Sequence, residues 1–167
     1  HHQSALEILV TEPDTVALAA LYEDIATQSI MSGETEAALA SAQKALDLAK
    51  KMNSYEAIAR SYLTLGSIMN WTGEKKRARE CLEKGLNIAL DNGFLDIAVG
   101  AYNEVAGTFP IEEEEKAMEY YKKGYDLAKK VGTIYKQSWI AANLATRHLG
   151  KGEMTKAVLM AEESVIL

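Results

Sequence analysis

The sequence is short of proline and nearly free of cysteine: two prolines and one cysteine, Cys81, occur among its 167 residues. A lone cysteine makes neither an internal disulfide nor a thiolate metal cage. This fits a reducing compartment, so we predict a cytoplasmic protein. Because proline is scarce and Ala, Leu, Glu and Lys are abundant, helix is favoured along the whole chain. No apolar run approaches the roughly 20 residues that span a bilayer, and no membrane role is expected.

Basic charge is also scarce. Lys and Arg number 18 against 24 Asp and Glu, which gives a net charge of −6 and leaves a nucleic-acid role without electrostatic support. Hydrophobic residues make up 48% of the chain, enough for one domain with a core. His1 and His2 resemble the remnant of an affinity tag and are left out of the fold prediction.

Motifs that carry chemistry are missing. The sequence has no glycine-rich phosphate loop, no His-Glu-x-x-His pattern and no Ser, His and Asp set that spacing brings together. The acidic run at 112–115 is interpreted as a helix start, where acids favour the helix dipole, and not as a cation site. Cys81 is expected to be a small helix residue and His148 a packing residue. We therefore predict no enzyme, no catalytic residues, no metal site and no cofactor.

What the sequence does contain is an internal repeat. Similar five-residue segments begin at residues 5, 45, 85 and 124, at offsets of 40, 40 and 39. Two further series and one turn have the same period: Ala38, Ala78, Ala117 and Ala157; Tyr22, Tyr62 and Tyr102; and Gly33, Gly73 and Gly152, with Pro110-Ile111-Glu112 in the third copy. Several independent series at one period indicate a repeat protein.

Each period divides into two helices. Apolar residues spaced by three and four run from Tyr55 to Met69, stop at 71–74, and resume from Ala78 to Ala89. The predicted helices are 14–32, 34–52, 54–72, 74–92, 94–109, 111–131, 133–150 and 152–167, after a partial helix at 3–11. We expect a single domain, 3–167, with repeats of about 14–53, 54–93, 94–132 and 133–167.

Small residues recur where the helices of a pair should cross closely. The alanine series has this role on the second helix, and Gly66 has it on the first, with Ala26, Ala106 and Ala145 at matching places. A larger side chain there would push the backbones apart. The tyrosine series is expected to fill the space between successive pairs.

These positions resemble the tetratricopeptide repeat, whose pattern has an aromatic, Leu-Gly, a second aromatic, then Ala and a ring. The second copy places Tyr62, Leu65-Gly66, Met69, Ala78 and Leu82 there, and the third places Tyr102, Val105-Ala106, Phe109, Ala117 and Tyr121. The resemblance covers nearly the whole chain. It implies an all-α fold: a right-handed α-α superhelix of about four antiparallel helix pairs.

The unit of 40 residues is longer than the usual 34. This long form resembles the repeats of multidomain signalling ATPases, ATP-dependent transcription activators and ATPase-linked nucleotide cyclases, and the segment 138–145 adds to the likeness. Gln3 falls midway through a second helix, and the apolar residues 165–167 make no polar cap. Both features favour a fragment of a larger signalling or transcription-regulatory protein.

In this fold the first helix of each pair lines the inner face. The resemblance therefore implies a binding surface made of Arg60, Ser67, Asn70, Trp71, Asn103, Glu104, Trp139 and Asn143. The two tryptophans would be apolar anchors, since Trp and Arg are frequent in binding hot spots. The alternative is a solvated face with both tryptophans packed between repeats. The places where some relatives clamp a C-terminal carboxylate hold Thr27, Ser67 and Gly107, so that mode is not expected.

The predicted function is a non-catalytic protein-interaction or scaffolding module. Its partner would be a protein, a peptide or a neighbouring domain of the same parent chain. Two alternatives remain: a sensor of a peptide or small-molecule effector, and a self-assembly element that associates end to end through 165–167. The basic residues at 75–79 and the acidic run at 112–115 are also expected to form ion pairs between repeats.

Overall fold

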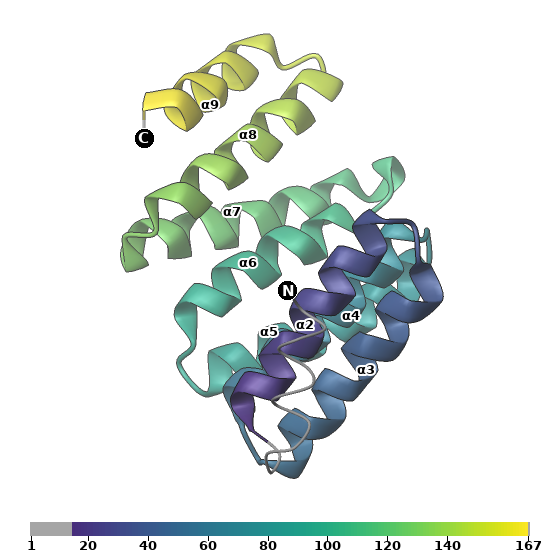
Figure 1. Ribbon diagram of the computed structural model, residues 1–167. Helices are drawn as coiled ribbons and strands as arrows, with labels where there is room; N and C mark the ends of the chain where they lie inside the picture. Colours follow the sequence, from purple (N-terminus) through teal and green to yellow (C-terminus); the bar gives the residue numbers. More distant parts are fainter. Residues whose placement is uncertain (1–14, 167) are drawn as a thin grey trace. The chain divides into compact units, whose positions relative to one another are not determined.

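The computed structural model describes residues 15–166, which form eight α-helices and one short 3₁₀ helix, with no strand in that range (Figure 1). The helices are α2 (Val16–Met31), α3 (Thr35–Lys51), α4 (Tyr55–Trp71), α5 (Lys75–Asp91), α6 (Leu95–Gly107), η1 (Ile111–Glu113), α7 (Glu114–Val131), α8 (Ile134–Gly150) and α9 (Met154–Ile166). The predicted helix ends lie within three residues of these. The partial helix at 3–11, the histidine pair and Leu167 lie outside the described residues.

The helices group into two compact units that divide between Phe94 and Leu95. In the first unit α2 packs on α3, α3 on α4 and α4 on α5; in the second α6 packs on α7, α7 on α8 and α8 on α9. The first helices of successive pairs also touch, α2 with α4 and α6 with α8. The all-α repeat of helix pairs is thus confirmed. The single domain of residues 3–167, with its four repeat bounds, stays a prediction.

The small residues lie where the period places them. Ala26, Ala38, Ala78, Ala106 and Ala117 are fully buried. A Cβ built on Gly66 would lie 2.5 Å from the Leu82 Cγ and 3.0 Å from the Ala78 carbonyl oxygen, which shows how closely α4 and α5 cross. Ala145 differs, because it is only partly buried. It lies in the last described pair, where Ala157 is the one buried residue among the α9 side chains that the structure describes.

The tyrosine series is half-buried and has a second, unpredicted function. Tyr62 packs against the apolar core of the first unit, between the Lys50 ammonium at 5.6 Å and the Lys84 ammonium at 6.0 Å from its ring centre. Tyr22 meets Lys44 in the same way at 5.4 Å. A ring beneath a cation adds about 0.5–1 kcal/mol at exposed sites. The first two copies of the repeat thus carry a Lys–Tyr contact from first helix to second, whereas Tyr102 in the third packs against Tyr120.

The turns follow the predicted pattern with one variation. Gly33, Gly73 and Gly152 have positive φ at the turn inside a pair, and Pro110 with η1 replaces this turn in the third copy. The turn between pairs has glycine at 93 and 132, but Asn53 occupies that place in the first unit, at φ 54°. Asparagine tolerates this left-handed region better than other side chains.

Candidate functional site

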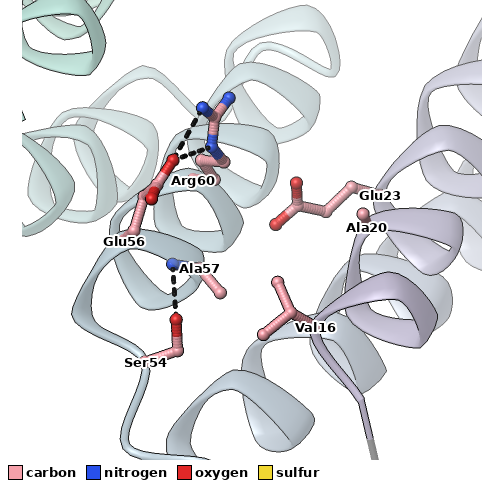
Figure 2. Close-up of a pocket in the computed structure, with 7 residues that line it drawn as sticks. All are labelled: Val16, Ala20, Glu23, Ser54, Glu56, Ala57 and Arg60. Atoms are coloured by element: carbon pink, nitrogen blue, oxygen red, sulfur yellow. Dashed lines mark hydrogen bonds and ion pairs between the residues drawn. The ribbon is translucent and has the colours of Figure 1, made fainter.

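Two neighbouring cavities lie between α2 and α4 in the first unit, and together we call them the α2–α4 groove. The first cavity has a volume of about 130 Å³. Its lining is shown in Figure 2 and consists of Val16, Ala20 and Glu23 from α2, the cap residue Ser54, and Glu56, Ala57 and Arg60 from α4. Both helix starts are capped, since the Thr15 hydroxyl accepts from the Leu18 amide and the Ser54 hydroxyl from the Ala57 amide.

The second cavity is larger, about 350 Å³, and more apolar. It is lined by Thr27, Ile30, Leu63, Thr64, Ser67, Ile68 and Trp71. Trp71 is 79% exposed, so its ring is not packed between repeats. The alternative that treats this tryptophan as a packing residue therefore does not fit.

Helical spacing explains why these side chains share one groove. Lining residues follow one another at intervals of three or four along α2, from Val16 to Ile30, and along α4, from Ala57 to Trp71. Side chains at such intervals lie on one face of a helix. Because α2 and α4 are the first helices of successive pairs and touch each other, their lined faces border a common space.

Glu23 is the one carboxylate that α2 contributes to the first cavity, and Figure 2 shows its carboxyl group directed toward α4. The Ser61 hydroxyl donates to Glu23 Oε1 at 2.7 Å. Burial raises the pKa of Glu23, while the Ser61 hydrogen bond and the Arg60 charge act in the opposite direction. Glu23 is not among the residues predicted for the binding surface, and no motif in the sequence marks it as part of a cavity.

Arg60 was predicted to belong to the binding surface, but its guanidinium pairs with a carboxylate of its own helix. Its Nη2 and Nε donate to Glu56 Oε1 at 2.9 and 3.3 Å, one helical turn away. Both side chains are about half exposed, so this ion pair contributes under about 1 kcal/mol. Arg60 therefore pairs with Glu56 and acts on Glu23 only through its charge. With two carboxylates and one guanidinium, the lining of the first cavity keeps a net negative charge.

Asn70 also serves its own hairpin, because its side-chain oxygen accepts from Lys75 Nζ at 2.7 Å across the turn from α4 to α5. Ser67 lines the second cavity, as predicted for a groove residue. The first unit thus brings Arg60, Ser67 and Trp71 to the groove and holds Asn70 at its end. Their binding function stays a prediction.

In the second unit the predicted amides bind each other. Asn143 Nδ2 donates to Asn103 Oδ1 at 2.8 Å, and Asn103 is only 4% exposed. The pair joins α6 to α8, 40 residues apart, and Lys136 joins Asp96 at the same offset at 2.6 Å. Trp139 is 39% exposed on α8. Burial raises the pKa of the Tyr121 phenol, and the charge of nearby Glu104 raises it further. The hydrogen bond between Asn103 and Asn143 therefore stabilises the packing of α6 on α8.

The acidic run contains a structural ion pair that the sequence did not reveal. Glu114 is buried at the start of α7, and its Oε2 accepts from Arg147 Nη1 on α8 at 2.7 Å. Lys116 pairs with Glu113, and Arg77 with Glu74, each within its own turn. The predicted pairing of 75–79 with 112–115 would join the two units and stays a prediction.

The surroundings of Cys81 and His148 disfavour a reactive function for either side chain. Burial raises the pKa of the Cys81 thiol, and the nearby Lys84 and Arg77 offset this only in part, which disfavours a thiolate. His148 was expected to pack; it is mostly buried but its Nδ1 also lies 2.6 Å from Glu153 Oε2 at the α8–α9 turn. This contact fixes a turn and brings no nucleophile to the ring.

Among the described residues, no three His, Cys, Asp or Glu side chains are grouped to hold a metal ion. The described helices include none with the length and hydropathy needed to cross a bilayer.

No family model matches the chain, and a comparison with curated proteins finds no relative. Solved structures are similar. BtubC (BKLC) from P. vanneervenii superposes with a TM-score of 0.84 at 20% identity, over 99% of this chain and 68% of that one. A Rap protein complexed with competence and sporulation factor gives 0.88 at 17%, over 99% and 46%. The nearly identical TPR-like repeats of a kinesin-light-chain-type protein from Podosopora anserina give 0.72 at 14%, over 99% and 82%.

These likenesses show the fold: an all-α helical-repeat solenoid of the tetratricopeptide type. The chain spans less than half the length of the Rap protein and about two thirds of BtubC. At such low identities the likeness extends to the backbone and not to the side chains that bind ligands.

Proposed function

We propose that this chain is a non-catalytic interaction module whose α2–α4 groove receives a short extended segment of a partner protein or of a neighbouring domain. The observation that supports it best is the second cavity. An exposed tryptophan borders an apolar hollow of about 350 Å³ between α2 and α4, the first helices of two successive pairs. Exposed Trp beside a pocket is typical of binding hot spots.

The solved relatives support the same class of function. One of them, the Rap protein, is complexed with competence and sporulation factor. Stacked helix pairs offer a row of equivalent side chains along their first helices, and such a row suits a linear ligand. We further propose a place in a larger signalling or transcription-regulatory protein in the cytoplasm, as the long repeat unit suggests.

The test is selection of random ten-residue peptides, displayed on phage, on the full 167-residue chain. Selected peptides should bind the unchanged chain and lose at least about tenfold in affinity with Trp71→Ala, the size of a typical hot-spot truncation. Tyr135→Ala is the matched control, since Tyr135 is an equally exposed aromatic that lines neither cavity. If no peptide is enriched, or if both variants bind alike, the groove is not an interaction site.

Self-association is a second candidate because α9 has an uncovered apolar face. Val158 is 50% exposed and Leu159 is 55% exposed, and Val165, about two turns further on, is 85% exposed. At the equivalent place in the first unit, helix α4 covers α3. The end-to-end hypothesis requires that a second copy of the chain binds to this face of α9.

A further inference from the structure

We infer that the α2–α4 groove selects a peptide segment with a basic side chain, lysine or arginine, three or four residues away from a large apolar side chain. The basic group would enter the first cavity beside Glu23, and the apolar group would enter the second beside Trp71. This inference rests on the proposed function and narrows its ligand class.

The charge of the first cavity favours a cation. Its lining contains two carboxylates, Glu23 and Glu56, and one guanidinium, Arg60. One net negative charge is left, and the guanidinium hydrogen-bonds to Glu56 at 2.9 Å and not to Glu23. Among the described residues, Ser61 alone donates to the Glu23 carboxylate, and it donates to one oxygen, Oε1. A carboxylate accepts about four hydrogen bonds, so capacity remains for an ammonium or guanidinium donor.

The size of the cavity agrees with this choice. A volume of about 130 Å³ accommodates the end of one long side chain but not a folded element. Val16, Ala20 and Ala57 provide apolar walls for the methylene stem, and the carboxylate lies beyond them. Lysine and arginine combine an apolar stem with a charged head in this way. The Thr15 and Ser54 caps already occupy amide hydrogens at the helix starts, which disfavours an anion there.

The spacing follows from the helix geometry. On α4 the lining of the first cavity centres near Ala57 and that of the second near Ser67, a difference of ten residues. At a rise of 1.5 Å per residue this is roughly 15 Å. An extended peptide advances about 3.3 Å per residue, so this distance corresponds to four or five residues of backbone. The length of the basic side chain covers part of the distance, which shortens the spacing to three or four residues.

The second cavity completes the recognition. Ile30, Leu63 and Ile68 make its apolar walls and Trp71 its exposed rim. Its lining holds no charged side chain and is mostly apolar, which favours an apolar ligand group over a charged one. One charged and one apolar cavity at a fixed distance define both the composition and the spacing of the segment.

The experiment starts from peptides selected on the full chain and continues with synthetic ten-residue peptides measured by fluorescence anisotropy. The selected sequences should share an Arg or Lys three or four positions from Phe, Leu or Trp. Replacing that basic residue by Gln should weaken binding about tenfold, as for a desolvated charge pair. Moving it to a spacing of one or seven residues should weaken binding to the same degree.

Substitutions in the protein identify the partner of the basic group. Glu23→Gln should weaken the basic peptide about tenfold and leave the Gln-substituted peptide within twofold. Asp24→Asn is the matched control: it removes the same charge from the adjacent, exposed residue, which lines neither cavity, and should have less than a twofold effect. Arg60→Gln should leave binding unchanged or tighten it. A cooperative thermal unfolding transition in each variant, at or above the temperature of the unchanged chain for Glu23→Gln, guards against misfolding.

Contrary outcomes are distinct from failure of the proposed function. If Arg60→Gln weakens binding and Glu23→Gln tightens it, the first cavity takes an anion and the inference is overturned. Equal effects of Glu23→Gln and Asp24→Asn would also overturn it, because only long-range charge would then matter. Selected peptides that lack a basic residue but depend on Trp71 would keep the interaction module and reject its charge selectivity. The absence of any selected peptide would remove both.

Discussion

The Ser61 hydroxyl donates to the Glu23 carboxylate at 2.7 Å, joining two residues 38 positions apart on α4 and α2. Ser61 is fully buried at a place where the equivalent residues of the second unit, Ala101 and Ala141, are alanines. One serine in an otherwise apolar column therefore allows a carboxylate to be held at the edge of the core. This contact links the stability of the first unit to the charge of its groove.

Glu23→Gln should make stability less dependent on pH. Burial raises the pKa of Glu23 above its ordinary value near 4.5. A raised pKa means that the folded state binds the proton more tightly than the unfolded state does. The resulting contribution to the free energy of unfolding is complete below pH 4.5 and is lost as the pH rises through the folded-state pKa. The Gln variant should thus gain free energy of unfolding at pH 7 relative to the unchanged chain, and the difference should vanish near pH 4.

Urea unfolding followed by circular dichroism at the two pH values measures this difference. Asp24→Asn is the control, because it removes an exposed carboxylate on the same helix. Equal stability of Glu23→Gln and the unchanged chain at both pH values would show that Ser61 fully compensates for the burial of the charge.

Gly85→Ala should destabilise the first unit by about 1–3 kcal/mol, the usual cost of overpacking. The new Cβ would lie 2.9 Å from the Ala59 carbonyl oxygen, which belongs to a helix backbone and does not rotate away. Gly100→Ala is the matched control, because Gly100 also lies within a helix but has no atom within 4 Å of the added Cβ. That change should stabilise by about 0.5–1 kcal/mol through helix propensity. Thermal unfolding separates the two, and a stabilising Gly85→Ala would contradict the close crossing of α4 and α5.

Asn53→Ala should cost about 1 kcal/mol, because alanine pays the full penalty for the left-handed conformation at φ 54°. Asn53→Gly should be neutral or slightly stabilising, as the equivalent turns with Gly93 and Gly132 suggest. The comparison is a pair of urea titrations. Equal stability of the Ala and Gly variants would mean that the turn can adopt another conformation at little cost.

The sequence predicts the backbone of this chain far better than its polar contacts. A period of 40 residues positions Ala38, Ala78 and Tyr62 correctly, because burial and close crossing depend on which face of a helix a residue occupies. The same period cannot specify side-chain rotamers. It placed Asn103 and Asn143 on the inner face as ligand-binding groups, and the structure shows them hydrogen-bonded to each other.

Glu114 and Arg60 illustrate the same difference. Glu114 belongs to a run of four glutamates that looks uniformly solvated in the sequence, yet it alone is buried against Arg147. The replacement of a glycine turn by Pro110 and η1 sets where α7 begins, and so decides which glutamate faces α8. Arg60 has Glu56 one turn away on its own helix, and the two side chains pair because residues four positions apart on a helix are neighbours.

Arg147→Met should destabilise the second unit by about 3 kcal/mol, because it leaves Glu114 buried without its cation. Adding Glu114→Gln should restore part of the loss, since the remaining side chain is then neutral. Arg77→Met, which removes a guanidinium from an exposed pair with Glu74, should cost under about 1 kcal/mol. Chemical denaturation of the unchanged chain, Arg147→Met, Glu114→Gln and the double variant gives the coupling energy. Strictly additive effects of the two changes would show that the pair contributes no interaction energy.

Val158→Lys should suppress self-association if the uncovered face of α9 binds a second copy. The comparison with the first unit motivates this: Leu46 is 3% exposed beneath α4, whereas Val165, its counterpart 119 residues later, is 85% exposed. Sedimentation velocity should show a mass that rises with concentration for the unchanged chain and stays monomeric for the variant. Gln28→Lys adds the same charge at an exposed residue of α2 and should leave the association intact. A monomer at all concentrations would exclude a second copy as the occupant of this face, since an apolar patch alone does not specify a partner.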